Sequence, residues 1–274
     1  LLYGFMSLWA LTTIYPFIWV ILNSFKPRGL IRSDTFSLPI GDKFTLENYV
    51  TAFKRVDIGT AYVNSIVISG AVTVVVMVLA GLAAYAMVRY SFRLRGFLHS
   101  MIIASMMFPV FSTIIPVFRM ESSWGIVNTG SIWLTRLSVV LPQIAGNLSF
   151  AIIVLMGFIR SLPVDLEEAA YLEGYNVYQI FFRIIMPLAK PSFATVGIFT
   201  FLWSYNDLFL QMFFLRSKKF FTITRLLNEI SSQAGTNYGL MVAAVVMVVI
   251  PVLVVYIFLQ NYIIKGMTAG AVKG

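Results

Sequence analysis

Six long apolar runs divide this chain, and they constrain its fold more than any other feature of the sequence. A helix needs about 20 apolar residues to cross the hydrocarbon core of a membrane, and each run approaches or reaches that length. Charged residues make up 11% of the chain and fall mainly between the runs, where they avoid the cost of burial in lipid. The predicted spans are residues 2–22, 61–88, 97–118, 137–159, 192–215 and 238–260. The sequence thus predicts an all-α integral membrane protein with about six transmembrane helices.

Prolines and small residues inside the runs predict how the helices pack. Neighbouring helices can satisfy the backbone groups that a proline frees, so we expect kinks instead of breaks. The prolines concerned are Pro16, Pro109, Pro116, Pro142 and Pro251. In the second run, Gly70 and Gly81 with nearby alanines form a face that permits close helix packing.

The spacing of the runs leaves no room for a separate soluble domain. We predict a single transmembrane domain over residues 1–274, with a core at about 61–260, a loop at 160–191 and a tail at 261–274. The apolar start at 1–23 is not interpreted as a signal peptide, because the chain begins inside an apolar run. The absence of cysteine from the sequence excludes disulfides and thiolate chemistry.

Charge counting leaves the orientation of the spans open. Six crossings place both termini on one side, together with the turn at 89–96 and the loop at 160–191. That side carries eight of the 20 Lys and Arg residues, and the opposite loops carry twelve. The positive-inside rule would then place the opposite loops in the cytoplasm. The net charge of +9 suits anionic lipid headgroups or an acidic partner, and basic residues split between two sides do not suit nucleic acid.

The loop at 160–191 has the pattern of two short helices. Pro163 and Asp165 suit a helix start, Gly174 suits its end, and a second helix is predicted from Asn176 to Met186, stopped by Pro187. Spacing of three and four residues predicts that one side of the first helix is shared by Leu166, Ala169, Ala170 and Glu173. The same spacing leaves Glu167 and Glu168 at the edge.

This loop resembles the EAA motif of the permeases of bacterial ABC importers. The motif residues are Glu168, Ala169, Ala170, Gly174, Ile184 and Pro187, with Met186 where leucine is usual. The resemblance implies a type I importer fold and a cytoplasmic coupling element that sits in a cleft of an ATPase subunit. It assigns Glu167 and the six motif residues to ATPase coupling, with Glu168 pairing to a basic residue there. An amphipathic helix lying on lipid headgroups is the alternative, but this acidic helix would be repelled by anionic lipid.

Other passages resemble the sugar-uptake permeases, of the type of the smaller permease of maltose systems. They are residues 45–53, 61–69, 199–210 and 266–274. The resemblance implies a bacterial inner-membrane location and four kinds of partner: a second related permease, two ATPase subunits, an extracytoplasmic sugar-binding protein and membrane lipid. It also implies that the tail residues Gly270, Ala271, Lys273 and Gly274 reach the ATPase interface.

The fifth run carries a candidate sugar path around Asp207, an acid predicted deep inside a membrane span. Trp203 lies four residues earlier, which would place both side chains on one helix face, and Tyr205 and Asn206 lie between them. Aromatic rings stack on sugars and carboxylate or amide groups bind hydroxyls. The alternative is a structural role for Asp207 in binding a neighbouring helix. Gln143 and Asn147, four residues apart, more often join helices than touch substrate.

Three classes of function are weighed against these features. A primary importer fits a chain without a Gly-Lys dipeptide, so that ATP and Mg²⁺ are expected on a partner subunit and no cofactor on this chain. An ion-coupled secondary transporter would need coupled acids or paired broken helices. A membrane enzyme would need a nucleophile and a base; with the single His99 interpreted as interfacial, we predict no catalytic residues and no metal site.

Overall fold

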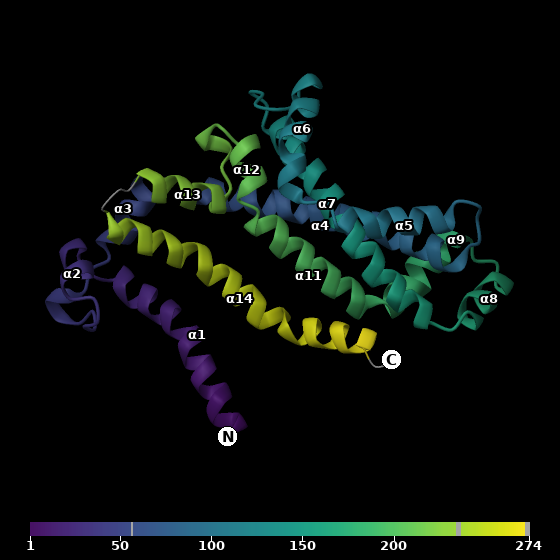
Figure 1. Cartoon of the computed structure of the whole chain (residues 1–274), viewed down its shortest axis with the longest axis horizontal. Helices are drawn as coiled ribbons and strands as arrows, with labels where there is room; N and C mark the ends of the chain where they lie inside the picture. The colour runs from purple at the N-terminus through teal and green to yellow at the C-terminus, as the bar shows by residue number, and fades with distance from the viewer. Residues whose placement is uncertain (56, 234–236, 272–274) are drawn as a thin grey trace. The chain divides into compact units, whose positions relative to one another are not determined.

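The computed structural model describes residues 1–55, 57–233 and 237–271, and within these ranges the chain is helical and contains no strand (Figure 1). The predicted all-α class is therefore confirmed. Two compact units can be distinguished: Leu1–Val63 with Phe221–Tyr256, and Asn64–Phe220 with the chain after Tyr256. The helices α4 (Ile58–Arg89) and α14 (Tyr238–Ala271) contribute to both units.

The first unit contains the helical segments that precede α4 and α14. They are α1 (Leu2–Ser24), α2 (Arg28–Ser33), η1 (Gly41–Lys43), α3 (Glu47–Arg55) and α13 (Ile223–Gln233). The helix α13 is amphipathic and buries Ile223, Leu226 and Ile230. These side chains line one small cavity with Ile58 of α4 and Val248 of α14, so α13 packs on both helices.

The second unit is organised around α7 (Ile132–Ser161), which contacts α5, α6, α11 and α12. Figure 1 shows α7 and α11 running beside one another. The bounds of the other elements are α5 Arg95–Met106, α6 Val110–Ser123, α8 Asp165–Leu172, α9 Val177–Ile180, η2 Phe181–Ile185, α10 Met186–Leu188, α11 Lys190–Asn206, α12 Phe209–Phe214 and η3 Lys218–Phe220.

Three helices in the described ranges are long and apolar enough to cross a membrane, namely α1, α4 and α7. Two further pairs meet the same criteria together but are bent, by 104° between α5 and α6 and by 82° between Val177–Leu188 and α11. Counting each bent pair as one span gives up to five, and the segment Tyr238–Val254 of α14 is a shorter apolar helix. About six spans were predicted; the described helices confirm several apolar spans, and the shorter helix falls in the sixth predicted run.

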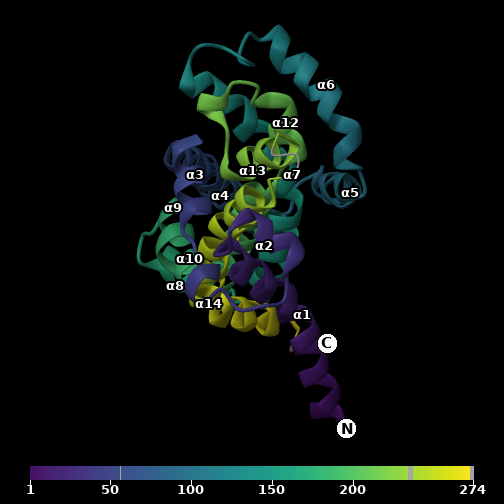
Figure 2. The same ribbon diagram turned by 90° about the vertical axis from the view of Figure 1, so that its left-hand side faces the viewer.

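The predicted continuous helix at 97–118 is wrong, because the chain breaks between Met106 and Val110. Pro109 stands immediately before α6, and a proline disfavours helical backbone in the residue before it. Figure 2 shows α6 leaving α5 at a steep angle. The other four prolines in the apolar runs, Pro16, Pro116, Pro142 and Pro251, lie inside helices as predicted.

The predicted helix at 192–215 is also interrupted. The helix α11 ends at Asn206, Asp207 has extended backbone (φ −69°, ψ 98°), and α12 begins only at Phe209. The side chains of Trp203 and Asp207 therefore do not share one helical face, and the spacing argument that joined them fails. Asp207 accepts a hydrogen bond from the backbone N–H of Leu210 (3.2 Å), which satisfies one of the N–H groups that lack a partner within the first turn of α12.

Candidate functional site

The loop between α7 and α11 forms two short helical segments, as the sequence predicted. The first, α8, ends before Gly174, whose φ of +84° lies in the left-handed region that glycine adopts without strain. Asn176 then starts the second segment through a capping box, in which its side chain accepts from the Gln179 backbone N–H and the Gln179 side chain accepts from the Asn176 N–H. The second segment does not stop at Pro187 but continues to Leu188 through the π-helical turn η2.

The helix α8 buries Glu167 and Ala170, whereas Leu166, Ala169 and Glu173 are exposed. The side predicted to be shared by Leu166, Ala169, Ala170 and Glu173 is therefore mostly exposed. The buried residues Glu167 and Ala170 are three positions apart, which places them on adjacent turns of the helix.

Glu167 is held by the last turns of α4. Its Oε1 accepts from Arg89 Nε at 2.5 Å and its Oε2 accepts from the Tyr85 hydroxyl at 2.7 Å. Arg89 also donates from Nη2 to the Leu162 carbonyl oxygen at 2.9 Å, which ties α4 to the start of the same loop. The charges of Arg89 and Glu167 are thus paired and hydrogen-bonded in a site from which water is largely excluded.

The same face of α4 receives the second segment of the loop. Gly81, Tyr85 and Arg89 follow one another at four-residue intervals, and we call them the docking stripe. The Phe181 ring lies 5.6 Å from the ring of Tyr85. A Cβ on Gly81 would lie 2.9 Å from Phe181 Cζ and 2.8 Å from Phe193 Cζ, so only glycine permits this approach. This confirms the predicted close packing at Gly81; at Gly70 nothing lies within 4 Å of the corresponding position.

The outer surface of the loop is apolar and acidic. Glu168 and Ala169 are exposed, and Leu172 is 90% exposed. The remaining exposed apolar side chains of the loop are Val164, Leu166, Tyr171, Val177, Tyr178, Phe182 and Leu188. Pro187 is exposed and Ile184 half-buried, while the adjacent Ile185 is fully buried. Among the described residues, no ion pair involves Glu168. Large exposed apolar surfaces with polar rims are typical of interaction sites.

Tyr171 provides a second, exposed link between the loop and α4. Its hydroxyl lies 3.0 Å from the hydroxyl of Tyr90, the residue after α4. The hydrogen bond with Tyr90 raises the pKa of Tyr171 above its ordinary value, and burial adds to the increase.

Asp207 belongs to a buried polar network between α7 and α11. Gln143 donates from Nε2 to Asp207 Oδ2 at 3.0 Å and accepts from the Ser204 hydroxyl at 2.5 Å. Gln211 donates to the Ser204 carbonyl at 3.1 Å, and Asn147 donates to the Gln143 carbonyl at 2.7 Å. The sequence contains Gln143 and Asp207 in separate apolar runs, 64 positions apart, and the fold brings them together.

The neighbours of Asp207 have different environments. Trp203 is 47% exposed and packs edge-on against Phe150, with ring centres 4.7 Å apart. Asn206 is exposed and donates to the Leu202 carbonyl, whereas Tyr205 is buried and stacks on Phe201. Of the four predicted path residues, Trp203 and Asn206 are thus open to a solute, Asp207 is half-buried and Tyr205 is enclosed.

Of the predicted tail residues, Gly270 and Ala271 form the end of α14, and Lys273 and Gly274 lie outside the described residues. His99 is half-buried near the start of α5. In the part of the chain that the structure describes, no group of three or more His, Cys, Asp or Glu side chains is placed to hold a metal ion.

Two buried charged groups were missed in the sequence. Lys26, fully buried in the first unit, donates from Nζ to the carbonyls of Asp34 and Thr35 at 2.9 Å each, and burial lowers its pKa. Glu121 in α6 is 1% exposed, and its Oε2 has no hydrogen-bond partner among the described residues. Neither position follows an apolar periodicity that would have revealed its burial.

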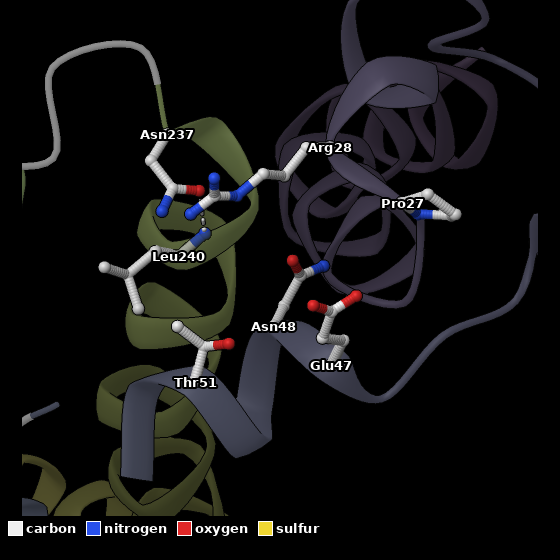
Figure 3. Close-up of a pocket in the computed structure, with 7 residues that line it drawn as sticks. All are labelled: Pro27, Arg28, Glu47, Asn48, Thr51, Asn237 and Leu240. Atoms are coloured by element: carbon white, nitrogen blue, oxygen red, sulfur yellow. Dashed lines mark hydrogen bonds between the residues drawn. The ribbon is translucent and has the colours of Figure 1, made fainter. Parts of the chain in front are cut away.

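A polar pocket of about 260 Å³ opens in the first unit beside the start of α14 (Figure 3). Arg28 and Glu47 line it with Asn48, Thr51 and Asn237. The Asn48 amide is fixed by donating to the carbonyls of Ser24 and Lys26. The pocket therefore offers both donors and acceptors, which suits a small hydroxylated solute or ordered water.

Comparison with known proteins identifies relatives over nearly the whole chain. Residues 77–269 match the family described as binding-protein-dependent transport system inner membrane component. The diacetylchitobiose uptake system permease protein NgcG of Streptomyces coelicolor is 33% identical over 99% of this chain and 88% of that protein. The trehalose transport system permease protein SugB of Mycobacterium tuberculosis is 32% identical over 95% of this chain and 93% of that protein.

A solved structure shows the same fold. A chain of a bacterial ABC transporter involved in the import of the acidic polysaccharide alginate superposes with a TM-score of 0.81 at 24% identity, covering 94% of each chain.

Proposed function

Because this chain belongs to the family of binding-protein-dependent transport system inner membrane components, we propose that it is a permease subunit of an ATP-driven importer for a disaccharide or short oligosaccharide. Family membership makes it a multi-pass protein of the inner membrane. Support for the sugar class comes from the relatives, among which are permeases named for diacetylchitobiose, for trehalose, and for melibiose, raffinose and stachyose. The structural feature that best supports this mechanism is the loop at 160–191, which is anchored on α4 and exposes an acidic and apolar surface.

The proposed assembly contains this subunit, a second related permease, two ATPase subunits and an extracytoplasmic sugar-binding protein. A solved alginate importer, whose matching chain is 18% identical with a TM-score of 0.69, is in complex with a pentasaccharide-bound periplasmic protein, which supports a binding-protein partner. ATP and Mg²⁺ would be bound by the ATPase subunits. The chain as a whole, 1–274, would act as one transmembrane domain.

The outer surface of the loop is the proposed contact with the ATPase. Glu168 would pair with a basic side chain, and Ala169, Leu172 and Tyr178 would lie in an apolar cleft. Gly174 and Pro187 would set the turn and the end of the two segments, and Ala170 and Ile184 would support them from behind. The exposed position of these apolar groups favours this role, because covering them removes them from water. The tail at Gly270, Ala271, Lys273 and Gly274 is proposed to reach the same subunits.

For the sugar path, we assign direct contact to Trp203 and Asn206 and a supporting role to Asp207 and Tyr205. The half-exposed indole of Trp203 offers an apolar plane to a sugar ring, and the exposed Asn206 offers an amide oxygen. Asp207 already accepts bonds from Gln143 and Leu210, which leaves it less free to bind a substrate hydroxyl.

Reconstitution of the complex in proteoliposomes tests this function. Uptake of a labelled oligosaccharide is expected to require both ATP and the binding protein. Uptake driven by a proton or sodium gradient without ATP would contradict the proposal and favour a secondary transporter.

Glu168→Lys tests the coupling surface within the same assay. The lysine would meet the basic partner as a like charge, so uptake should fall by about tenfold or more while the subunit stays in the membrane. Glu173→Lys is the matched control, because Glu173 is also exposed but lies at the end of α8, where a positive charge is favoured. Equal uptake in the two variants would exclude Glu168 as the contact.

A further inference from the structure

Two neighbouring acids of α8 have opposite environments, and the difference has a mechanical consequence. Glu168 faces solvent, whereas Glu167 is 4% exposed and turned toward α4. The family resemblance assigned both acids to ATPase coupling. A carboxylate enclosed by its own chain cannot touch a partner subunit, so Glu167 must contribute to coupling in another way.

The geometry around Glu167 fixes both the position and the rotation of α8. Each carboxylate oxygen has its own donor: Arg89 Nε for Oε1 and the Tyr85 hydroxyl for Oε2. The two donors are one helical turn apart on α4, so the carboxylate is hydrogen-bonded at two points along that helix. The bond from Arg89 Nη2 to Leu162 adds a third point, at the end of the loop nearest α7.

These bonds resist sliding of α8 along α4. Separating Arg89 from Glu167 would leave an uncompensated charge in a site from which water is largely excluded, which is more costly than breaking an exposed ion pair. The Tyr85 ring also packs on Phe181 of the second segment. Both segments of the loop are thus held by one stripe of one membrane-spanning helix.

We propose that Tyr85, Arg89 and Glu167 form a rigid joint through which movement of the coupling loop is transmitted to α4. Glu167 is then a positioning residue, and Glu168 alone of the two acids contacts the partner subunit. The joint rests on the proposed importer function, because it needs an ATPase that moves the loop. Through this joint, a displacement of the short helix α8 also displaces the 32-residue helix α4.

The first test compares neighbouring isosteric variants, Glu167→Gln and Glu168→Gln, with Tyr85→Phe as a second change in the joint. In Glu167→Gln and Tyr85→Phe, the assembled complex should still hydrolyse ATP, while sugar transported per ATP falls by about tenfold, a size within the range of coupling between contacting groups. A purely structural role would lower hydrolysis and transport in proportion to the amount of assembled complex. Arg93→Gln, an exposed arginine just beyond α4, is the control and should keep the wild-type ratio.

The second test measures the rigidity of the joint directly. The sequence has no cysteine, so spin labels can be placed at Leu79 of α4 and Glu173 beside α8, both exposed. In the wild-type complex, the distance distribution should be narrow and unchanged between nucleotide-free and ATP-trapped states. In Glu167→Gln it should broaden or shift on ATP binding.

Two results would overturn the joint: a wild-type distance that changes with nucleotide, or an unchanged transport-to-hydrolysis ratio in both Glu167→Gln and Tyr85→Phe. These failures are distinct from failure of the importer function. If the wild-type complex did not transport sugar with ATP, the proposed function would be wrong, and the distance measurement would still decide whether α8 and α4 move as one body.

Discussion

At the scale of single residues, the important side-chain partners are distant in sequence, so helical spacing alone does not predict them. Gln143 shows this best, because its amide serves Asp207 with one group and Ser204 with the other. A buried amide that satisfies two partners leaves both unpaired when it is removed. Gly81 shows the opposite case, because two aromatic rings occupy the space that a side chain at this position would need.

Gly81→Val is expected to destabilise the permease by about 1–3 kcal/mol, since its Cβ would overlap the nearly fully buried rings of Phe181 and Phe193. The measurement is the thermal denaturation midpoint of the purified complex. Gly70→Ala is the control, because nothing lies within 4 Å of its Cβ position, and it should leave the midpoint unchanged or raise it. Equal losses in both variants would show that packing at Gly81 is not special.

Gln143→Leu is expected to cost about 1–3 kcal/mol, because it leaves the Asp207 carboxylate and the Ser204 hydroxyl without their partner. Trp203→Ala should instead lower sugar uptake with little loss of assembled complex, since the indole is half-exposed. Stability and uptake are measured on the same preparations. The assignment fails if Gln143→Leu assembles as stably as the wild type or if Trp203→Ala fails to assemble.

At the scale of elements, short helices are fixed by their ends. The helix α8 has only eight residues, too few to be stable alone, so its shape depends on Gly174, on the Asn176 capping box and on packing against α4. Local chemistry also acts at the starts of two other helices: Pro109 stands immediately before α6, and Asp207 accepts a hydrogen bond from the Leu210 N–H in the first turn of α12.

Gly174→Ala should destabilise the loop locally by about 1 kcal/mol, because a Cβ is disfavoured at φ +84°. Asn176→Ala should lose a similar amount through the capping box. Hydrogen exchange of the backbone amides of α8 and α9 reports both effects as faster exchange. Gly157→Ala, inside α7 with open space around its Cβ position, serves as the reference; faster exchange of α8 in that variant as well would contradict a local effect.

At the scale of the whole molecule, membership of the inner-membrane family sets the location, and the orientation follows from the proposed partners. The coupling surface must face the cytoplasm, where ATP is available, and the residues between α11 and α14 must then face outward. This arrangement opposes the count of basic residues, in which the outward loops carry twelve and the cytoplasmic side carries eight.

Labelling of single cysteines tests the orientation. With an impermeant thiol reagent on intact cells, Ser217→Cys should react and Ser161→Cys should not; both positions are exposed. Permeabilised cells provide the control, in which both variants should react. Labelling of position 161 alone in intact cells would reverse the orientation and exclude the proposed ATPase contact.

What the sequence determined by itself is what depends on composition and short-range chemistry. Apolar runs predict spans because a bilayer forces the backbone to satisfy its hydrogen bonds within helices. The paired short helices of the loop followed from Gly174 and Asn176, whose turn and cap involve residues within a few positions. The motif around Glu168 was sufficient to indicate the family, which the comparisons then showed.

Only the tertiary structure decided which of two adjacent acids faces inward. Consecutive helical residues point about 100° apart, so either could have been buried, and the choice was made by Tyr85 and Arg89, some 80 positions earlier. The hydrogen-bond partner of Asp207 was likewise set by packing, since Gln143 is a residue of another helix. Local sequence encodes where helices form, whereas the side chains that meet between helices depend on how those helices pack.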